Sequence, residues 1–210
     1  MKMPETPFRL LFVGSRAIAG GERYLEILEA ALRGGADAFL LREKTMEGGP
    51  LLALAREARE RTARAGALFL VSDRIDVAIA SGADGVQLPE NSFIPEEARR
   101  LLGAGKRIGR SVHDLGGARE AERRGADFVV VGPLYPTPGK GRALGAPAAG
   151  GIRASIGIPA VAVGGIDEGR VPEVRSAGFG AIAVIRAIAE AGDPETAARS
   201  LRARLEAERP

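Results

Sequence analysis

The sequence of 210 residues contains no cysteine, a single histidine and a single glutamine. The absence of cysteine excludes disulfides, thiolate nucleophiles and cysteine metal sites. No apolar run is long enough to span a bilayer, and the first residues, MKMPETPFRL, lack the order of basic, apolar and small residues that marks a secretory signal. We therefore expect a cytoplasmic protein without a membrane partner.

The sequence also lacks a strong excess of charge of one sign. The 30 basic residues are balanced by 27 acidic residues, which gives a formal net charge of +3. In segments such as 55–65 and 200–210 the two signs alternate, which is typical of solvated helix faces. We therefore expect no nucleic-acid partner.

One phrase, by contrast, occurs four times. The copies are GGADAFLLRE (34–43), SGADGVQLPE (81–90), RGADFVVVGP (124–133) and AGFGAIAVIR (177–186). Each is a turn followed by a short apolar run, which is typical of a parallel strand buried on both faces. The copies start 47, 43 and 53 residues apart, which suits two helix–strand units each. The phrase therefore marks every second strand of an eight-stranded ring.

The remaining apolar runs and the helical periodicity complete this pattern. Further strands are predicted at 8–14, 67–73, 106–112 and 158–165, and helices at 22–33, 51–65, 75–82, 95–103, 114–125, 146–157, 167–178 and 193–208. The alternation predicts an α/β fold, a single-domain (β/α)8 TIM barrel that spans residues 1–210. The sequence leaves the oligomeric state open, with a homodimer as one option.

In such a barrel, functional groups lie at the carboxyl ends of the strands and in the loops that follow. The residues predicted there are Arg42, Lys44, Asp73, Gln87, His113, Gly132, Lys140, Gly164, Gly165, Ile185 and Arg186. The only histidine, the only glutamine and two of the four lysines thus fall on one rim. We expect this rim to hold the functional site.

Two pairs of rim residues suit a phosphate group. Gly164-Gly165 and Ile185-Arg186 follow the seventh and eighth predicted strands, where barrels of this class bind phosphate. Small residues allow backbone N–H groups to approach phosphate oxygens. We predict that the backbone at these positions binds a phosphate.

Three basic residues near the rim indicate a second binding place for an anionic group of the ligand. Arg42 and Lys44 end a buried strand, and an unpaired charge held away from water is costly, so an anionic ligand explains them best. Lys140 lies in a loop, 132–147, that is dense in glycine and proline and that we expect to close over the substrate.

The roles of two acid–base residues follow from their positions. His113 comes directly after an apolar strand and has a reference pKa suited to proton transfer, so it is predicted to be a general acid and base. Asp73 has three open interpretations: an N-cap for the helix near Ile75, an ion-pair partner of the nearby cations, or a catalytic or metal-binding group. No serine–histidine–acid triad and no metal-ligand spacing is evident, so no metal site is predicted.

Several motifs together resemble the thiamine phosphate synthase superfamily. They are LLREK (40–44), SDRIDVAIASGADGVQLPENSF (72–93), IGRSVHDLGGA (108–118), GADFVVVGPLYPTPGKG (125–141) and PAVAVGGI (159–166). The resemblance covers nearly the whole chain. It implies one of two activities: a synthase that joins a pyrimidine pyrophosphate to a thiazole phosphate, or a tautomerase that aromatises a thiazole carboxylate phosphate.

Departures from the synthase pattern favour the tautomerase branch. The synthase pattern implies a glutamine where this chain has Leu40, Asn-Asp where it has Ser72-Asp73, and a second magnesium carboxylate within the segment 88–92 that is absent here. The segments VQLP-x-x-SF and GRSVH look like the tautomerase, whose histidine corresponds to His113. The loop PTPGK, in contrast, looks like the synthase.

The sequence-based prediction is therefore an isomerase, a thiazole tautomerase of thiamine biosynthesis without cofactor, in which His113 moves one proton of a phosphorylated thiazole. Gln87 and Gly132 are predicted to contact the substrate, and Ser111 and Asp73 to support the site. Two alternatives stay open: a magnesium-dependent thiamine phosphate synthase that uses Asp73 and Glu90, and a non-catalytic regulatory or ligand-binding barrel.

Overall fold

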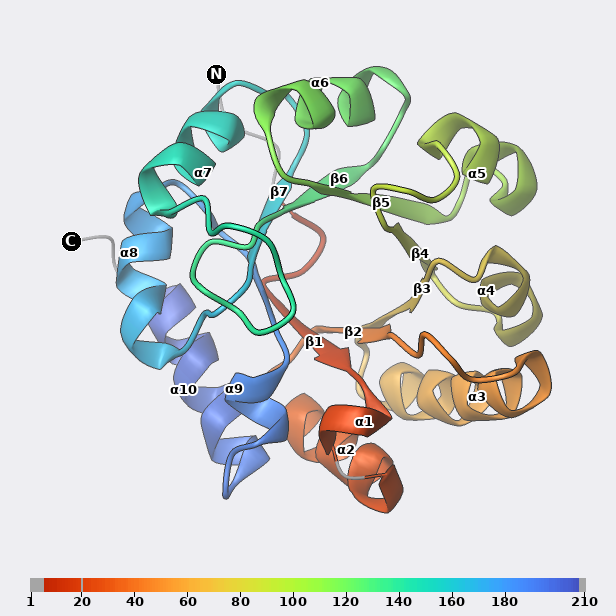
Figure 1. The fold of residues 1–210 in the computed structure, drawn as a ribbon. Helices are drawn as coiled ribbons and strands as arrows, with labels where there is room; N and C mark the ends of the chain where they lie inside the picture. The colour runs from red at the N-terminus through yellow and green to blue at the C-terminus, as the bar shows by residue number, and fades with distance from the viewer. Residues whose placement is uncertain (1–5, 20, 208–210) are drawn as a thin grey trace.

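The computed structural model describes residues 6–19 and 21–207. Over these residues eight parallel strands pair in sequence order, and the last pairs with the first, so the sheet closes into a barrel (Figure 1). The strands are β1 (Leu10–Gly14), β2 (Ala38–Leu41), β3 (Leu68–Ser72), β4 (Gly85–Leu88), β5 (Arg107–Val112), β6 (Phe128–Val131), β7 (Ala160–Val163) and β8 (Ile182–Val184). The predicted TIM barrel is confirmed, and the repeated phrase does mark every second strand.

Helices surround the barrel on its outside (Figure 1). They are α1 (Arg16–Ala19), η1 (Gly21–Arg23), α2 (Tyr24–Arg33), α3 (Gly48–Arg64), α4 (Ile75–Ser81), α5 (Pro95–Leu102), α6 (Leu115–Arg123), α7 (Ala146–Ala154), η2 (Glu168–Arg170), α8 (Val171–Ser176), α9 (Arg186–Ala189) and α10 (Pro194–Glu206). Within the described ranges, no helix combines the length and the apolar character needed to cross a membrane.

The observed helices differ from the predicted ones at a few places. The short helices α1 and α9 were not predicted, because a single turn shows no apolar periodicity. The predicted helix 167–178 is divided into η2 and α8, and Pro172 lies in the first turn of α8, where its missing N–H does no harm.

Both faces of the sheet are buried, which explains the continuous apolar runs. Leu10, Phe12 and Phe69 face the helices, whereas Leu11 and Leu70 fill the barrel interior. The interior is tightly packed: a Cβ at Gly109 would lie 2.3 Å from the ring of Phe128.

The strand register groups the interior residues into layers. Strands of such a barrel tilt, so residues at equal height shift by one position from each strand to the next. With this shift, the register places Leu40, Gln87, Val130 and Ala183 of the even-numbered strands in one layer. The same shift places Val13, Ser72, Ser111 and Val163 of the odd-numbered strands in the next layer toward the carboxyl end. These two layers lie beneath the rim.

The aspartate of the repeated phrase has a structural role at the opposite end of the barrel. Asp84 N–H donates to Phe69 O at 2.8 Å, and Asp84 Oδ2 accepts from Phe69 N at 2.8 Å. Asp127 forms the same reciprocal pair with Ile108, and Asp37 forms it with Leu10. Each aspartate also binds one arginine from a helix: Arg59, Arg99 and Arg202, respectively. The fourth copy has Phe179-Gly180 in place of Ala-Asp, so it has no aspartate that could form this hydrogen-bond pair.

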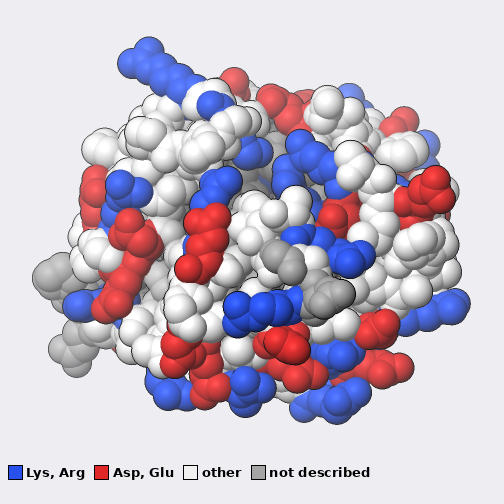
Figure 2. Space-filling model, turned by 60° about the horizontal axis from the view of Figure 1, so that its bottom comes forward, with Lys and Arg blue, Asp and Glu red and all other residues white. Residues whose placement is uncertain are grey.

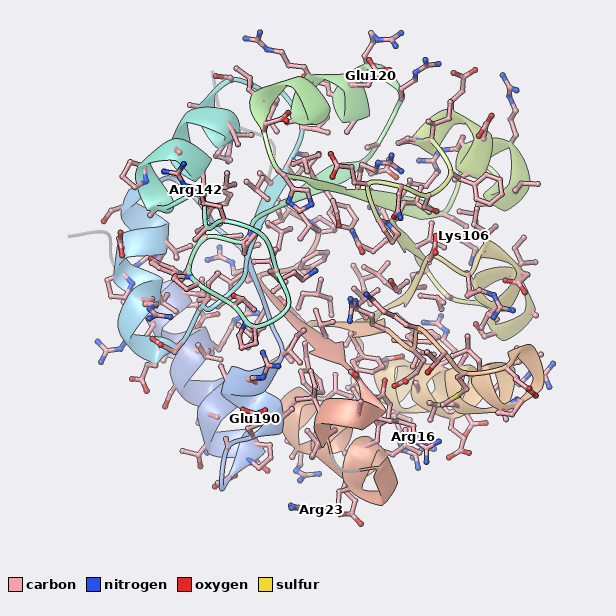
Figure 3. All side chains as sticks on the ribbon, in the orientation of Figure 1. Arg16, Arg23, Lys106, Glu120, Arg142 and Glu190 are labelled. Carbon is pink, nitrogen blue, oxygen red and sulfur yellow. The ribbon has the colours of Figure 1, made fainter. Side chains whose placement is uncertain are left out.

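Charged side chains on the helices form the solvated faces that the sequence predicted. Glu120 of α6 accepts hydrogen bonds from Arg123 and Arg124, which lower its pKa to about 2. Figure 3 shows Glu120 and Arg23 on the outer rim of the molecule, away from the barrel centre. The basic residues of these helices are thus interspersed with acids rather than gathered into one stripe.

Candidate active site

A cavity of about 380 Å³ opens at the carboxyl ends of the strands. Its floor is the apolar interior of the barrel, including Leu40, Val130 and Ala183. Its walls include most of the site residues predicted from the sequence, namely Arg42, Gln87, His113, Gly132, Lys140, Gly164, Gly165, Ile185, Arg186 and the supporting residue Ser111. Lys44 and Asp73 lie outside this lining set. The volume is in the range typical of small-molecule sites.

The cations at the mouth of the cavity are close enough to repel one another. Lys140, in the loop after β6, has its pKa lowered by burial and by the positive charges of Arg42 and Lys44. Among the described residues, no carboxylate forms an ion pair with any of the three. Figure 2 shows basic side chains around a hollow on the face turned to the viewer. This arrangement suits a ligand with more than one negative charge.

The wall formed by β7 and β8 carries backbone donors. Gly164 and Gly165 have φ values of 101° and 65°, a conformation that other residues rarely adopt. A Cβ at Gly164 would lie 2.6 Å from Pro133 Cβ, so these glycines also let the loop after β6 pack closely. In the described chain, neither glycine N–H has a backbone acceptor. Both lie beside Ile185 on the cavity wall and can donate to a phosphate.

Arg186 lies on the same wall, but its charge is already partnered. Its guanidinium is 3.2 Å from Oε1 of Glu190, the C-cap residue of α9. Its contribution to a phosphate site would therefore come from the backbone, as the sequence analysis expected, rather than from the charge.

His113 is held in one orientation. Its Nδ1 hydrogen-bonds to Gly132 O, and a carbonyl can only accept, so Nδ1 carries the proton. Its Nε2 lies 3.5 Å from Glu90 Oε2, the side chain is 46% exposed, and the residue lines the cavity. With the proton of a neutral imidazole on Nδ1, Nε2 is the nitrogen that can take up a second proton, and the Glu90 carboxylate beside it can stabilise the resulting cation.

Asp73 has a role that the sequence analysis did not predict. It is not the N-cap of α4, since that position belongs to Arg74, and it forms no ion pair with Arg42 or Lys44 within the described residues. Instead its Oδ1 accepts a hydrogen bond from Ser92 Oγ, and its φ of 67° is left-handed. The unusual backbone of Asp73 lies at the rim, where strained residues tend to be functional.

Arg110 of β5 is a rim residue that the sequence analysis missed. Its guanidinium donates to Phe93 O at 2.7 Å and to Glu90 O at 2.6 Å. It thereby holds the loop after β4, which carries both Glu90 and Ser92. The pKa of Arg110 lies below its ordinary value, because the effect of burial exceeds the opposing effect of the negative charges of Glu90 and Asp73. An arginine directly before Ser111 in a predicted strand was the only signal for this role.

The loop 132–147 packs over the barrel mouth (Figure 1). Pro136, Thr137 and Lys140 of this loop line the cavity. Tyr135 ties the loop to α8, because its hydroxyl donates to Glu173 Oε2 at 2.7 Å and Arg170 lies over its ring at 4.7 Å. Burial raises the pKa of Tyr135, and the hydrogen-bonded Glu173 carboxylate raises it further. The loop is therefore part of the site wall in this structure.

Comparison with known proteins identifies the family. The family model described as thiamine monophosphate synthase matches residues 10–188, which is most of the chain. The chain belongs to this family. The thiamine monophosphate synthase family comprises enzymes of thiamine biosynthesis, so the predicted superfamily and pathway are confirmed, whereas the tautomerase branch is not distinguished.

Individual members of the thiamine monophosphate synthase family align along almost the whole chain. A protein of Geobacter sulfurreducens is 44% identical over 206 residues, 97% of each chain, and carries the name thiamine-phosphate synthase provisionally. The thiamine-phosphate synthase of Methanoculleus marisnigri is 43% identical over 203 residues, 95% of this chain and 96% of its own. The structure of thiamine phosphate pyrophosphorylase from Pyrococcus furiosus superposes with a TM-score of 0.88 at 36% identity, and the match covers 95% of this chain and 96% of the other. These names favour the transferase that was an alternative in the sequence analysis over the isomerase.

Proposed function

We propose that this protein is a thiamine-phosphate synthase. The reaction transfers a pyrimidinylmethyl group from its diphosphate to the nitrogen of a thiazole phosphate. The carbon–oxygen bond to the diphosphate breaks, the diphosphate leaves with the electron pair, and the nitrogen lone pair forms the new carbon–nitrogen bond. Two phosphorylated substrates must therefore occupy one cavity.

One observation carries this proposal: two sets of groups suited to anions lie at one cavity, a cluster of cations and a pair of glycine N–H groups. Arg42, Lys44 and Lys140 gather at the mouth without a carboxylate partner among the described residues. The N–H groups of Gly164 and Gly165, which follow β7, lie on the same cavity wall as Ile185, which follows β8. Three positive charges exceed what a single carboxylate would require, and they suit a diphosphate whose charge increases as it leaves. The glycine wall then receives the single phosphate of the thiazole.

Magnesium is the cofactor that this activity implies, in contrast to the expectation of no metal. In the described residues, no cluster of three or more histidine, aspartate or glutamate side chains could hold a metal by itself. Mg²⁺ commonly binds through one or two carboxylates together with substrate phosphates, and Asp73 beside the Ser92 hydroxyl fits that mode. Glu90 interacts with His113 instead. When bound, the ion would neutralise charge on the leaving diphosphate.

The test is the formation of thiamine phosphate from the two precursors in the presence of Mg²⁺. We expect the native chain to form product and Lys140→Gln to raise the KM for the pyrimidine diphosphate at least about tenfold. Lys106→Gln is the matched control, because Lys106 donates to Ala83 O at the other end of β5, far from the cavity. The proposal is contradicted if the native chain forms no thiamine phosphate. It is also contradicted if Lys140→Gln and Lys106→Gln have the same KM for the pyrimidine diphosphate.

A second candidate, the thiazole tautomerase, is favoured by the orientation of His113. Nδ1 is held by Gly132 O, and Nε2 lies at the cavity beside Glu90, which is an arrangement that suits a proton transfer. The measurement is the ultraviolet-monitored aromatisation of the thiazole carboxylate phosphate tautomer with native protein, His113→Gln and no protein. Acceleration that disappears in His113→Gln would establish this activity. Equal rates with and without protein would exclude it.

A further inference from the structure

The segment 136–143, here called the loop tip, is the part of the loop after β6 that carries Lys140. Within the described chain, the recorded hydrogen bonds of the tip stay inside the loop: Lys140 N donates to Thr137 O at 3.1 Å, and Thr137 Oγ1 donates to Tyr135 O at 2.9 Å. Backbone hydrogen bonds to the barrel or to the base of the loop begin at Tyr135 on one side and at Leu144 on the other. The position of the tip therefore depends on how these two flanking residues are held.

Tyr135 is held from three directions. Its N–H donates to Gly164 O at 3.0 Å, and its hydroxyl donates to Glu173 Oε2 of α8 at 2.7 Å. The guanidinium carbon of Arg170, which belongs to η2, lies 4.7 Å from the centre of the tyrosine ring. A cation at this distance from a ring face is attracted to it. The ring of Tyr135 thus fixes one end of the loop tip against the loop after β7.

Arg170 also contacts the opposite wall of the cavity. Its Nη1 donates to Gly165 O, and Gly164 and Gly165 form the glycine wall whose N–H groups suit a phosphate. Arg170 itself lines the cavity, and its side chain is 43% exposed. Its ion pair with Asp167 Oδ2 is 3.7 Å long, which is too long for a hydrogen bond. One guanidinium therefore contacts both the loop and the glycine wall.

The shape of the guanidinium explains why one side chain can make both contacts. The group is planar, so its face can lie over a ring while its N–H groups donate in the plane. A lysine ammonium is a compact point charge without such a face. We therefore expect lysine at position 170 to keep the charge and to lose the simultaneous contacts with Tyr135 and Gly165.

We propose that Arg170 is a positioning residue, which holds the loop tip and the glycine wall in a fixed relation through Tyr135 and Gly165. It thereby determines where Lys140 lies relative to the glycine N–H groups, and it does so without touching a ligand. The consequence for catalysis rests on the proposed function. Two substrates react when their reacting atoms are held about 3 to 3.5 Å apart, so a displaced tip should lower kcat.

The experiment is a double-mutant cycle of Arg170→Lys, Tyr135→Leu and the double variant. Arg204→Lys is the matched control, because Arg204 Nε donates to Glu168 Oε1 of the same η2 at 3.2 Å but lies outside the cavity lining. Amide hydrogen exchange is measured in the segment 134–145, which includes hydrogen-bonded N–H groups at both ends of the tip. Isothermal titration calorimetry with inorganic diphosphate measures how well the cations at the mouth are placed.

In Arg170→Lys we expect exchange in 134–145 to increase, and the affinity for diphosphate to fall, each by about threefold to tenfold. Tyr135→Leu should give the same changes although it alters no charge. The double variant should be no worse than the more affected single variant, because both substitutions break one link. Arg204→Lys should behave as the native protein. Native exchange and affinity in Arg170→Lys, or additive losses in the double variant, overturn the inference.

Steady-state kinetics separate positioning from direct contact with a ligand. At saturating concentrations of both substrates, kcat of Arg170→Lys should be about tenfold lower than that of the native protein. A native kcat with a raised KM for one substrate would show that Arg170 contacts that substrate, which overturns the inference.

These outcomes are separate from those of the proposed function. Changes in exchange and diphosphate affinity that follow the cycle, in a protein that forms no thiamine phosphate, support the positioning role and refute the synthase. Thiamine phosphate formation, with native exchange and native kcat in Arg170→Lys, supports the synthase and refutes the positioning role.

Discussion

Replacing Asp84 by alanine should destabilise the barrel measurably. The substitution removes the acceptor for Phe69 N at 2.8 Å and for Arg59 Nη1 at 2.7 Å. Hydrogen bonds to a charged group contribute about 1.5 to 3 kcal/mol each. The Arg59 side chain is 33% exposed and can be solvated instead, so its share must be discounted. The Phe69 N–H lies in the sheet and loses its acceptor, so the expected loss of unfolding free energy is about 2 to 3 kcal/mol.

This loss converts into a shift of the melting temperature. An unfolding entropy of about 2.1 cal/mol/K per residue gives about 0.44 kcal/mol/K for a chain of 210 residues. The melting temperature of Asp84→Ala should therefore fall by about 5 to 7 °C. Differential scanning calorimetry at neutral pH measures the shift, and urea unfolding checks it independently.

Glu60→Ala is the matched control, because it removes a carboxylate from α3, the helix that also carries Arg59. Glu60 pairs with Arg64, and both side chains are about 70% exposed (69% and 71%), so the expected change is about 1 °C or less. A decrease for Asp84→Ala no larger than that of the control would refute the reasoning that the repeated aspartate stabilises the barrel.

Three further predictions concern the rim. Diphosphate binding should weaken as the pH rises through the lowered pKa of Lys140 in the free protein, because the bound anion raises that pKa and binding is then coupled to proton uptake. Calorimetry in two buffers of different ionisation enthalpy measures the number of protons taken up. Lys140→Arg should abolish this uptake, because arginine stays protonated. Asp73→Asn should raise the Mg²⁺ concentration for half-maximal synthase rate about tenfold with an unchanged melting temperature, and an unchanged magnesium dependence would remove Asp73 from the metal site. Arg110→Met should increase amide hydrogen exchange in the segment 90–93 and lower activity, whereas native exchange rates there would show that Arg110 does not hold this loop.

Several site residues were predictable because the fold dictates their place. Gly164, Gly165 and Ile185 follow strands of a parallel barrel, and the carboxyl ends of such strands converge on one rim. The same reasoning predicted that Arg42 and Gln87 lie at this rim, and both line the cavity. The repeated phrase gave the strand spacing, and the spacing was sufficient to determine the fold class.

Other features depended on contacts that the order of residues does not reveal. The sequence allowed Asp73 to be an N-cap, an ion-pair partner or a catalytic or metal-binding group, and it did not indicate that Ser92 of the next loop donates a hydrogen bond to its carboxylate. Arg110 gave no periodic signal, since its role comes from three carbonyl groups in a neighbouring loop. The aspartate of the repeated phrase seemed part of a helix-ending turn, whereas its carboxylate binds the adjacent strand.

The sequence by itself determined the class of the fold, the rim that bears the site and the family, because apolar periodicity and local motifs are properties of short segments. Only the tertiary structure decided which charges meet, which nitrogen of His113 is held by Gly132 O and which groups donate to Asp73 and Ser111. Those properties depend on the register and tilt of strands that are distant in the sequence, and they arise only when the barrel closes.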